Sequence, residues 1–256
     1  GFLKKTLPKI PIIALTATAD KATRQDIVEQ LNIPDATQFL SSFDRKNIAL
    51  EVRPGHNRIS QIIHFIEQRP GQSGIMYCLS RKSTEKLAEK LQHQGISAEA
   101  YHAGLDFVQR TKIQEDFIYD KTQVICATIA FGMGIDKSNV RWVIHYNMPK
   151  NIEGYYQEIG RSGRDGLEAQ ALRKFTEGAD NQEVQLAKLD RMKQFSEATD
   201  CRRKILLSYF GELLSDNCGN CDVCKNPPEF IDGTVIAQKI LSAIVRVRES
   251  EAMGTI

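Results

Sequence analysis

The 256-residue sequence has no apolar run near the roughly 18 residues that cross a bilayer, so no membrane-spanning segment is expected. Its first residues lack the pattern of a secretory signal peptide. There is no internal repeat and no low-complexity tract, which excludes repeat architectures. The net charge of +2 and the pI of about 8.2 are too mild to mark a nucleic-acid-binding protein by themselves.

The sequence also lacks a G-x-x-x-x-G-K-[ST] loop, the motif that cradles nucleotide phosphates. No Asp-Glu-x-His box is present either. The chain alone is therefore not expected to hydrolyse ATP. The opening stretch "GFLKKTLPKIPIIALTATAD" lacks Met and enters an apolar run almost at once, so we interpret the sequence as part of a longer protein.

Hydrophobic residues make up 41% of the chain, enough for a sizeable core. Short apolar runs alternate with amphipathic stretches of about 10 to 15 residues, which predicts βαβ units and a parallel sheet. Strands are expected at residues 10–16, 73–80, 96–104, 122–128 and 140–147. Helices are expected at 18–33, 84–95, 106–119 and 152–160, with Asp20 and Asp106 as N-caps, Gly95 as a stop, and Ile113, Phe117 and Ile118 facing inward.

In a parallel sheet, ligands bind beyond the carboxyl ends of the strands. Four stretches are therefore candidates for function: "LSRKS", "YHAG", "ATIAFGMGID" and the turn that leads into "GRSGRDG". From about residue 176 the sequence becomes charged and helical in period, and the cysteines follow. "NPPEFIDG" is typical of a linker, and "TVIAQKILSAIVRVRES" predicts an amphipathic helix after it.

Four of the six cysteines are clustered: Cys201, Cys218, Cys221 and Cys224. Four thiolates suit a tetrahedral, structural zinc site with no open position. Gly219 lets the backbone turn around the ion, and Cys201 comes from a neighbouring helix. An iron–sulfur cluster and free thiols are the alternatives, although common cluster motifs have other spacings. Cys78 and Cys126 lie in apolar runs and are interpreted as small buried hydrophobes.

The stretch "QEIGRSGRDG" places Arg161 and Arg164 three residues apart among three glycines. Glycines permit close backbone approach, and arginine forks suit phosphate. One of these arginines can stabilise the charge that develops on a transferring phosphoryl group. The alternative is a solvated cationic loop. The solvated-loop interpretation is less favoured because other candidate residues also lie at the ends of predicted strands or just after them: Thr16, Thr18, Thr128, Gly132, Gly134 and Asp136.

Taken together, these stretches resemble superfamily 2 helicases. "LTATA" matches motif III, "IMYCLSR" motif IV, "ATIAFGMGID" motif V and "QEIGRSGRDG" motif VI. The four-cysteine pattern, with Cys201 opening "CRRKILLSYFGE" and the other three after it, resembles that of the RecQ family. The resemblance implies an ATP-driven 3′ to 5′ DNA helicase of recombination and repair, an α/β protein with RecA-like parallel sheets and flanking helices, a helical zinc-binding subdomain and the start of a winged helix.

The resemblance also assigns roles to residues. Arg164 is the expected arginine finger, with Arg161 beside it and Gln157 coupling nucleotide to DNA. Gly134 and Asp136 join the two arginines at the nucleotide. Arg81, His102 and Thr128 are expected on the phosphates of one DNA strand, and Thr16 and Thr18 in the motif linking hydrolysis to DNA. For His102, capping of the local backbone is the alternative.

The predicted domains are the end of a first RecA-like domain (1–47), a second one (48–173), the helical zinc-binding domain (174–230) and a truncated winged helix (231–256). The family returns an apolar strand after "GRDGL". Here no strand is recognised, and about a strand's worth of residues is expected to be missing near 171–173.

The implied cofactors are one structural Zn²⁺, with ATP and Mg²⁺ in the full-length protein. The implied partners are single-stranded DNA and duplex junctions, with a single-strand-binding protein and a topoisomerase by family resemblance, and no membrane. The expected location is cytoplasmic and nucleoid-associated in a bacterium, or nuclear in a eukaryote. The alternatives are a related RNA helicase and a zinc-containing DNA-binding module without motor activity.

Overall fold

The computed structural model describes residues 2–19, 21–132, 135–174, 183–229 and 232–253. The chain divides into two compact units, Gly1–Asn226 and Pro227–Ile256. The second unit consists of helix α10 (Thr234–Met253) and its flanking residues. In the part of the chain that is described, no helix combines the length and apolarity needed to span a bilayer.

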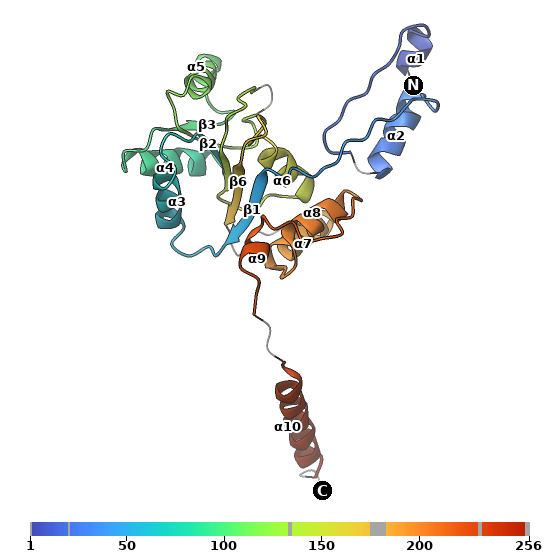
Figure 1. Cartoon of the computed structure of the whole chain (residues 1–256), viewed down its shortest axis with the longest axis vertical. Coiled ribbons are helices and arrows are strands. Elements are labelled where there is room, and N and C mark those ends of the chain that lie inside the picture. The colour runs from blue at the N-terminus through green and yellow to red at the C-terminus, as the bar shows by residue number, and fades with distance from the viewer. Residues whose placement is uncertain (1, 20, 133–134, 175–182, 230–231, 254–256) are drawn as a thin grey trace. The chain divides into compact units, whose positions relative to one another are not determined.

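The first unit is built on a six-stranded, fully parallel sheet, as the alternating sequence pattern predicts. The spatial order of the strands is β1-β6-β5-β2-β4-β3 (Figure 1). Their bounds are Ile48–Arg53 for β1, Gly74–Tyr77 for β2, Ala98–Tyr101 for β3, Val124–Ala127 for β4, Trp142–His145 for β5 and Ala169–Lys174 for β6. Strands β2, β4 and β5 are buried along their whole length, which explains their continuous apolar runs.

Strand β6 corrects the sequence prediction for this region. No strand was expected after "GRDGL", yet Ala169–Lys174 pairs with β1 on one side and β5 on the other. The segment was missed because its apolar run is too short. Ala169, Ala171 and Leu172 are buried, but Gln170 lies among them and charged residues adjoin both ends. The sheet therefore receives the strand that the family pattern requires.

Helices cover both faces of the sheet. Successive side chains of β2 point to opposite faces, so Ile75 and Tyr77 belong to one apolar core and Met76 and Cys78 to the other. Helices α3 (Arg58–Glu67) and α4 (Arg81–Gln92) pack into the core that contains Met76. Helices α5 (Phe107–Ile118) and α6 (Ile152–Ile159) pack into the core that contains Tyr77.

The helix ends follow local sequence signals. Asp106 is the N-cap of α5, as predicted. Its side chain accepts from the Gln109 amide over 2.8 Å and forms a complete capping box. The stop at Gly95 is also confirmed, since its φ of 76° is a conformation that favours glycine. Phe117 is fully buried, but Ile118 is exposed, and its predicted inward position is wrong.

Three helices carry the cysteine-rich region: α7 (Glu183–Glu197), α8 (Arg202–Tyr209) and α9 (Asp222–Lys225). We call residues 183–226 the cysteine module. Its buried residues Met192, Phe195, Leu206 and Phe210 belong to the same core as α6 and one face of the sheet. The module lies beside β1 and α6 in Figure 1. It is therefore packed as a continuation of the sheet domain.

The N-terminal residues contain α1 (Phe2–Thr6) and α2 (Lys21–Leu31), and α2 is the helix expected there. The N-cap predicted at Asp20 lies outside the described residues. The strand predicted at 10–16 is wrong: those residues are irregular, with Ile13 and Leu15 81% and 91% exposed. A strand needs a neighbour to complete its hydrogen bonds, and no described segment pairs with this one.

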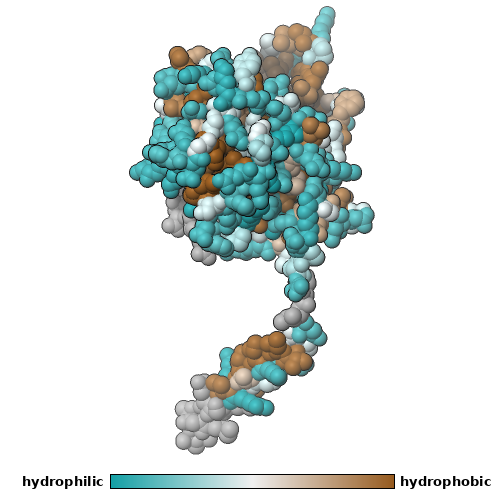
Figure 2. All heavy atoms as spheres, turned by 60° about the vertical axis from the view of Figure 1, so that its left-hand side comes forward, coloured by the Kyte–Doolittle hydropathy of each residue, from teal (hydrophilic) through white to brown (hydrophobic). Residues whose placement is uncertain are grey.

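Helix α10 also exposes apolar side chains, which gather visibly on that helix in Figure 2. Those exposed by about half or more are Val235, Ile236, Ile240, Leu241, Ile244, Val245 and Val247. An amphipathic helix was expected here. The assignment of residues 231–256 to a winged helix, like the other domain limits, stays a prediction.

Candidate functional site

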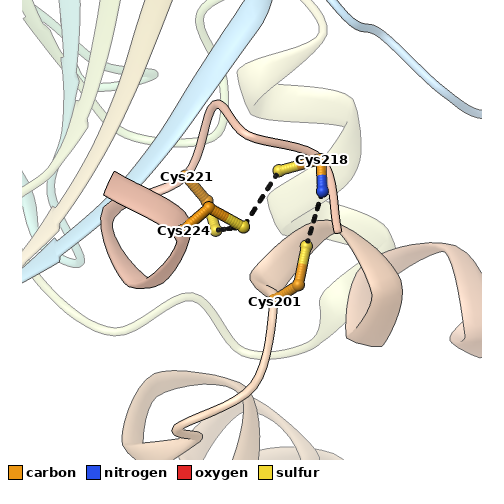
Figure 3. Close-up of side chains that lie close together, drawn as sticks. All are labelled: Cys201, Cys218, Cys221 and Cys224. Atoms are coloured by element: carbon orange, nitrogen blue, oxygen red, sulfur yellow. Dashed lines mark hydrogen bonds between the residues drawn. The ribbon is translucent and has the colours of Figure 1, made fainter. Parts of the chain in front are cut away.

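The four clustered cysteines converge on one point. Their sulfur atoms all lie within 4.8 Å of one another, with Cys221 Sγ 3.4 Å and Cys218 Sγ 3.9 Å from Cys224 Sγ (Figure 3). A tetrahedral zinc with Zn–S bonds of about 2.3 Å requires sulfur atoms about 3.8 Å apart. The cluster therefore fits a single tetrahedral ion with four thiolate ligands.

Local backbone structure brings the sulfurs together. Cys201 and Cys221 occupy the N-cap positions of α8 and α9. The Cys218 amide donates to Cys201 Sγ, and the Asn220 amide to Cys218 Sγ, each over 3.4 Å. Gly219 turns the chain with a φ of 66°, as the sequence predicts. Burial opposes ionisation of Cys201, but the backbone amides of Cys218 and Lys204 outweigh it and lower the pKa of Cys201 to about 7. These amides favour the thiolate, which is the form that a metal binds.

The structure also bears on the iron–sulfur alternative and on the two cysteines outside the cluster. In an iron–sulfur cluster the thiolates bind separate irons, so their sulfurs lie farther apart than four that share one ion. The observed spacing favours the single ion. Cys78 and Cys126 lie elsewhere, in the sheet core, and both are buried. Burial raises the pKa of Cys78 to about 12, so this thiol stays protonated, as expected of a small buried hydrophobe.

The loop of residues 160–166, here the arginine loop, lies against the loop that follows β4. Arg161 Nη1 donates to the Gly132 carbonyl. Gly132 has a φ of 121°, a conformation that other residues rarely adopt, and a Cβ there would lie 2.1 Å from the Arg161 guanidinium carbon. The Nε of Arg161 is buried and has no hydrogen-bond partner among the described residues. A buried donor left unpaired is uncommon in folded proteins.

Arg164 meets the same loop three residues further on. Its Nη1 donates to the Ile135 carbonyl over 3.0 Å and lies 3.7 Å from the Asp136 carboxylate. The Asp136 side chain is 97% exposed, so this ion pair is weak and free to rearrange. The structure thus brings Arg161, Arg164 and Asp136 together. Gly134 lies outside the described residues.

The position of the arginine loop refines the sequence prediction. The turn before α6 lies at the carboxyl end of β5, as expected. The arginine loop follows α6 and leads into β6, so it lies near the amino ends of β5 and β6. The Gly163 amide donates to the Val140 carbonyl, just before β5. The two arginines therefore contact the loop that connects β4 to β5, on its way back to the amino end of β5.

Lys137, which the sequence analysis did not single out, anchors this returning loop. Its ammonium is almost fully buried and donates to the Asp120 carboxylate over 2.7 Å and to the Ile118 carbonyl over 3.3 Å. The Lys137 hydrogen bond lowers the pKa of Asp120 below its usual 3.8. The sequence could not predict this role, because a single lysine at the end of a motif looks the same whether it is buried or exposed.

Lys137→Met is expected to lower the free energy of unfolding by about 1–3 kcal/mol at neutral pH, because two acceptors lose a charged donor. The folded pKa of Asp120 is depressed, so the pair contributes above pH 3.8. Its contribution disappears as the pH falls through the lower, folded-state pKa. Urea denaturation of both proteins across pH 3 to 7 measures the effect. A difference that grows toward low pH would contradict the assignment.

Two predicted residues far apart in the sequence meet directly. Gln157 Nε2, on α6, donates to Thr18 Oγ1 over 2.8 Å. Thr16 Oγ1 in turn accepts from the Thr18 amide over 3.4 Å. Thr16 and Gln157 are exposed and Thr18 is half-buried, so the contact lies near the surface. Gln157 was predicted to couple nucleotide to DNA, and this contact connects it to the stretch "LTATA".

Three of the predicted DNA-binding residues lie at the carboxyl ends of three adjacent strands. Arg81 begins α4 after β2, His102 follows β3, and Thr128 follows β4. Arg81 Nη1 would lie 3.0 Å from a Cβ at Gly104, so the arginine sits against the turn after β3. Arg81 is exposed and Thr128 partly so, which leaves both accessible to a backbone phosphate.

His102 differs from these two. It is only 4% exposed, its Nε2 lies 3.0 Å from Glu85, and its Nδ1 accepts from the Gly104 amide over 3.2 Å. Both ring nitrogens are therefore occupied within the protein. This geometry favours the alternative reading, in which His102 caps the local backbone and holds the turn beside Arg81. Direct contact with DNA would require the side chain to leave this position.

Comparison with known proteins decides the family. Residues 57–166 match the helicase conserved C-terminal domain, and residues 167–225 match the RecQ zinc-binding family. The chain is 46% identical to the ATP-dependent DNA helicase RecQ of Haemophilus influenzae, across 96% of the chain and 42% of that protein. The chain belongs to the RecQ family. It is also 38% identical to RecQ of Bacillus subtilis, across 93% of the chain and 43% of that protein.

These RecQ relatives are longer, and the chain spans about two fifths of their length. A mimivirus protein named as an ATP-dependent RNA helicase is 44% identical across 87% of the chain and 43% of that protein. Among solved structures, yeast Dbp5 bound to RNA and ADP BeF3 matches with a TM-score of 0.59 and 20% identity. That match covers 76% of the chain and 51% of Dbp5 and shows a shared fold. The RecA-like fold expected from the sequence is confirmed.

Proposed function

We propose that this chain forms the second half of the motor of an ATP-dependent, 3′ to 5′ DNA helicase that acts in recombination and repair. The observation that carries the proposal is the arginine loop. Two arginines converge on one loop, and Arg161 keeps a buried Nε without a partner among the described residues. An anion at this place would complete the hydrogen bonding of Arg161. RecQ family membership supplies the anion's identity, the phosphates of ATP.

In this proposal Arg164 is the arginine finger. Its side chain is 37% exposed and holds only a backbone carbonyl and an exposed carboxylate, so it can exchange these for a phosphate. ATP and Mg²⁺ would be held by a P-loop domain that this sequence does not contain. When bound, ATP supplies the phosphoryl group whose transfer drives the motor. Arg161 holds the β4–β5 loop in place, and Asp136 orients Arg164 until the nucleotide arrives.

DNA is proposed to cross the carboxyl ends of β2 and β4, where Arg81 and Thr128 are accessible. Contacts of this kind follow phosphates, so affinity should fall with salt and depend little on base sequence. The Gln157–Thr18 hydrogen bond offers a route between the two sites. It joins the helix before the arginine loop to the motif that links hydrolysis to DNA.

The cysteine module is proposed to bind one structural Zn²⁺ through Cys201, Cys218, Cys221 and Cys224. The sulfur geometry and the match to a zinc-binding family support this choice. A closed four-thiolate site has no open position for catalysis, so zinc would act on folding. A single-strand-binding protein, a topoisomerase and duplex junctions are proposed partners by family membership, with the enzyme at the nucleoid or in the nucleus.

Strand separation by the full-length enzyme tests this function. With ATP, a DNA duplex carrying a 3′ single-stranded tail should be unwound, while an identical duplex with a 5′ tail should not. A matched RNA duplex with a 3′ tail addresses the RNA alternative, which the name of the mimivirus relative keeps open. Unwinding of RNA alone would favour that alternative. Tight DNA binding without unwinding of any duplex would favour a binding module without motor activity.

A further inference from the structure

The segment that leads into β1 and the loop that leads into β6 run side by side, because these strands are parallel neighbours. Ile48 is in register with Ala169, and the Ala169 amide donates to the Asn47 carbonyl over 2.9 Å. Residues 42–47, here the linker segment, therefore lie next to the arginine loop. Residues that hold the linker segment in place therefore also affect the position of the arginine loop.

Arg45 of the linker segment grips the arginine loop through its backbone. Its guanidinium donates to three carbonyls in succession, those of Gly160 over 3.4 Å, Ser162 over 3.1 Å and Gly163 over 2.9 Å. These carbonyls flank Arg161 and precede Arg164. One planar cation with several donors can hold such a turn in a single conformation.

Asn47 adds a second grip from the same segment. Its Nδ2 donates to the carbonyls of Gly163 and Leu167, each over 2.9 Å. Gly163 has a φ of 58°, and a Cβ there would lie 2.4 Å from Asn47 Nδ2. The glycine in the middle of "GRSGRDG" is thus required by this close approach as well as by its backbone conformation.

The cysteine module in turn holds the linker segment. Arg203, on α8, is only 5% exposed and donates to the Asp44 carboxylate and the Arg45 carbonyl, each over 2.6 Å, and to the Ile48 carbonyl over 2.5 Å. The Asp44 side chain is also buried, at 8% exposed. Removing one partner of a buried, hydrogen-bonded ion pair lowers the stability of the protein far more than removing one partner of an exposed pair.

Further contacts join the same two parts. The Glu212 carboxylate accepts from the Phe43 amide over 2.8 Å, and the Phe43 ring stacks on Phe210 with centroids 4.5 Å apart. Asn220, between two of the clustered cysteines, donates from Nδ2 to the Lys46 carbonyl over 3.2 Å. The cysteine knuckle itself therefore contacts the linker segment.

We propose that Arg45 is a positioning residue for the arginine loop, and that Arg203 of the cysteine module holds Arg45 in place. The order of contact is cysteine module, linker segment, arginine loop. These contacts do not depend on the function of the arginine loop. Their effect on turnover, however, rests on the proposed function of that loop. A displacement of about 1 Å is enough to lower a catalytic rate about a hundredfold. The cysteine module would thereby act on catalysis without touching the nucleotide.

Amide hydrogen exchange in the zinc-loaded 256-residue chain tests the contacts directly. Arg203→Met should speed exchange in residues 160–166 by about tenfold, the equilibrium effect of losing one charged hydrogen bond. Arg202→Met is the matched control. Arg202 is the neighbouring buried arginine of α8, but it donates to Asp222 and to the Phe195 carbonyl, each over 2.6 Å, away from the linker segment. It should leave exchange in the arginine loop unchanged.

Zinc content is measured for every variant, because loss of the ion would unfold the module. Should Arg203→Met lose zinc, Asp44→Asn makes the same test, since it removes the charge and keeps the shape. Unchanged exchange in a zinc-loaded Arg203 or Asp44 variant overturns the proposal. Equal acceleration by Arg202→Met also overturns it, because the effect would then be general damage to the module.

Turnover by the full-length enzyme supplies the second readout. Arg45→Met should lower kcat for ATP at least tenfold with little change in KM, the pattern of a group that acts in the transition state. Arg45→Lys, which keeps one cation, should recover part of the loss. Faster exchange in the loop with normal kcat would support the positioning contacts and contradict the finger role of the loop, so the two proposals fail separately.

Discussion

Arg164→Ala in the full-length enzyme is expected to lower kcat for DNA-stimulated ATP hydrolysis by about 10³-fold or more, the range in which arginine fingers act. The reason is the state of Arg164 in the structure. It holds one backbone carbonyl and one exposed carboxylate, and neither contact is needed for the core. Removal should therefore affect the transition state and leave the fold and the DNA contacts intact. Steady-state ATPase assays with saturating single-stranded DNA measure it.

Two variants complete this test. Arg164→Lys should recover only a small part of the rate, because a lysine cannot reproduce the fork of donors that arginine presents to a phosphate. Arg191→Ala removes an exposed arginine of α7 that bonds only Gln194 in the described chain, and it should leave kcat unchanged. DNA affinity of all three variants should match the unmodified enzyme. Normal turnover of Arg164→Ala would contradict the finger assignment.

Cys221→Ser is expected to abolish zinc binding and to unfold the cysteine module, a loss on the order of 10 kcal/mol by the measure of zinc-finger peptides. Cys221 is fully buried and its backbone bridges to Leu50 of β1. The module shares its apolar core with α6 and the sheet. The loss should therefore spread beyond the metal site and lower the thermal stability of the first unit. Zinc content and thermal unfolding monitored by circular dichroism measure both effects.

Cys126→Ala is the thiol control for this variant. Cys126 is equally buried, but it lies in β4 within the sheet core and outside the cluster. It should keep its zinc and lose only the stability of a small cavity, about 1 kcal/mol. A Cys221→Ser protein that remains folded and active without zinc would contradict the structural role of the ion.

Features set by local sequence were predictable. The apolar runs of β2, β4 and β5 are buried on both faces, so periodicity and length identified them. The cap at Asp106 follows from the residue and its neighbours alone. The cysteine cluster was predictable too, because its ligands lie mostly within seven consecutive residues and their number and type determine the chemistry.

Features set by tertiary context were not predictable. Strand β6 carries little apolar signal and is formed because β1 and β5 supply partners on both sides. Residues 10–16 carry a strong strand signal but have no partner strand in the described chain. Arg45 and Arg203 are 158 residues apart and belong to no short motif, so only the fold shows that they meet. His102 fits a phosphate contact by sequence, whereas its burial favours capping of the local backbone.

The most direct test of the account is ATP turnover by the full-length enzyme with and without nucleic acid, in the presence of Mg²⁺. We predict low turnover alone, a large rise with single-stranded DNA, and loss of that rise in the Arg164→Ala variant. This result would show that the arginine loop completes an ATP site whose activity depends on DNA. Turnover that is unaffected by DNA, or that rises only with RNA, would contradict the account.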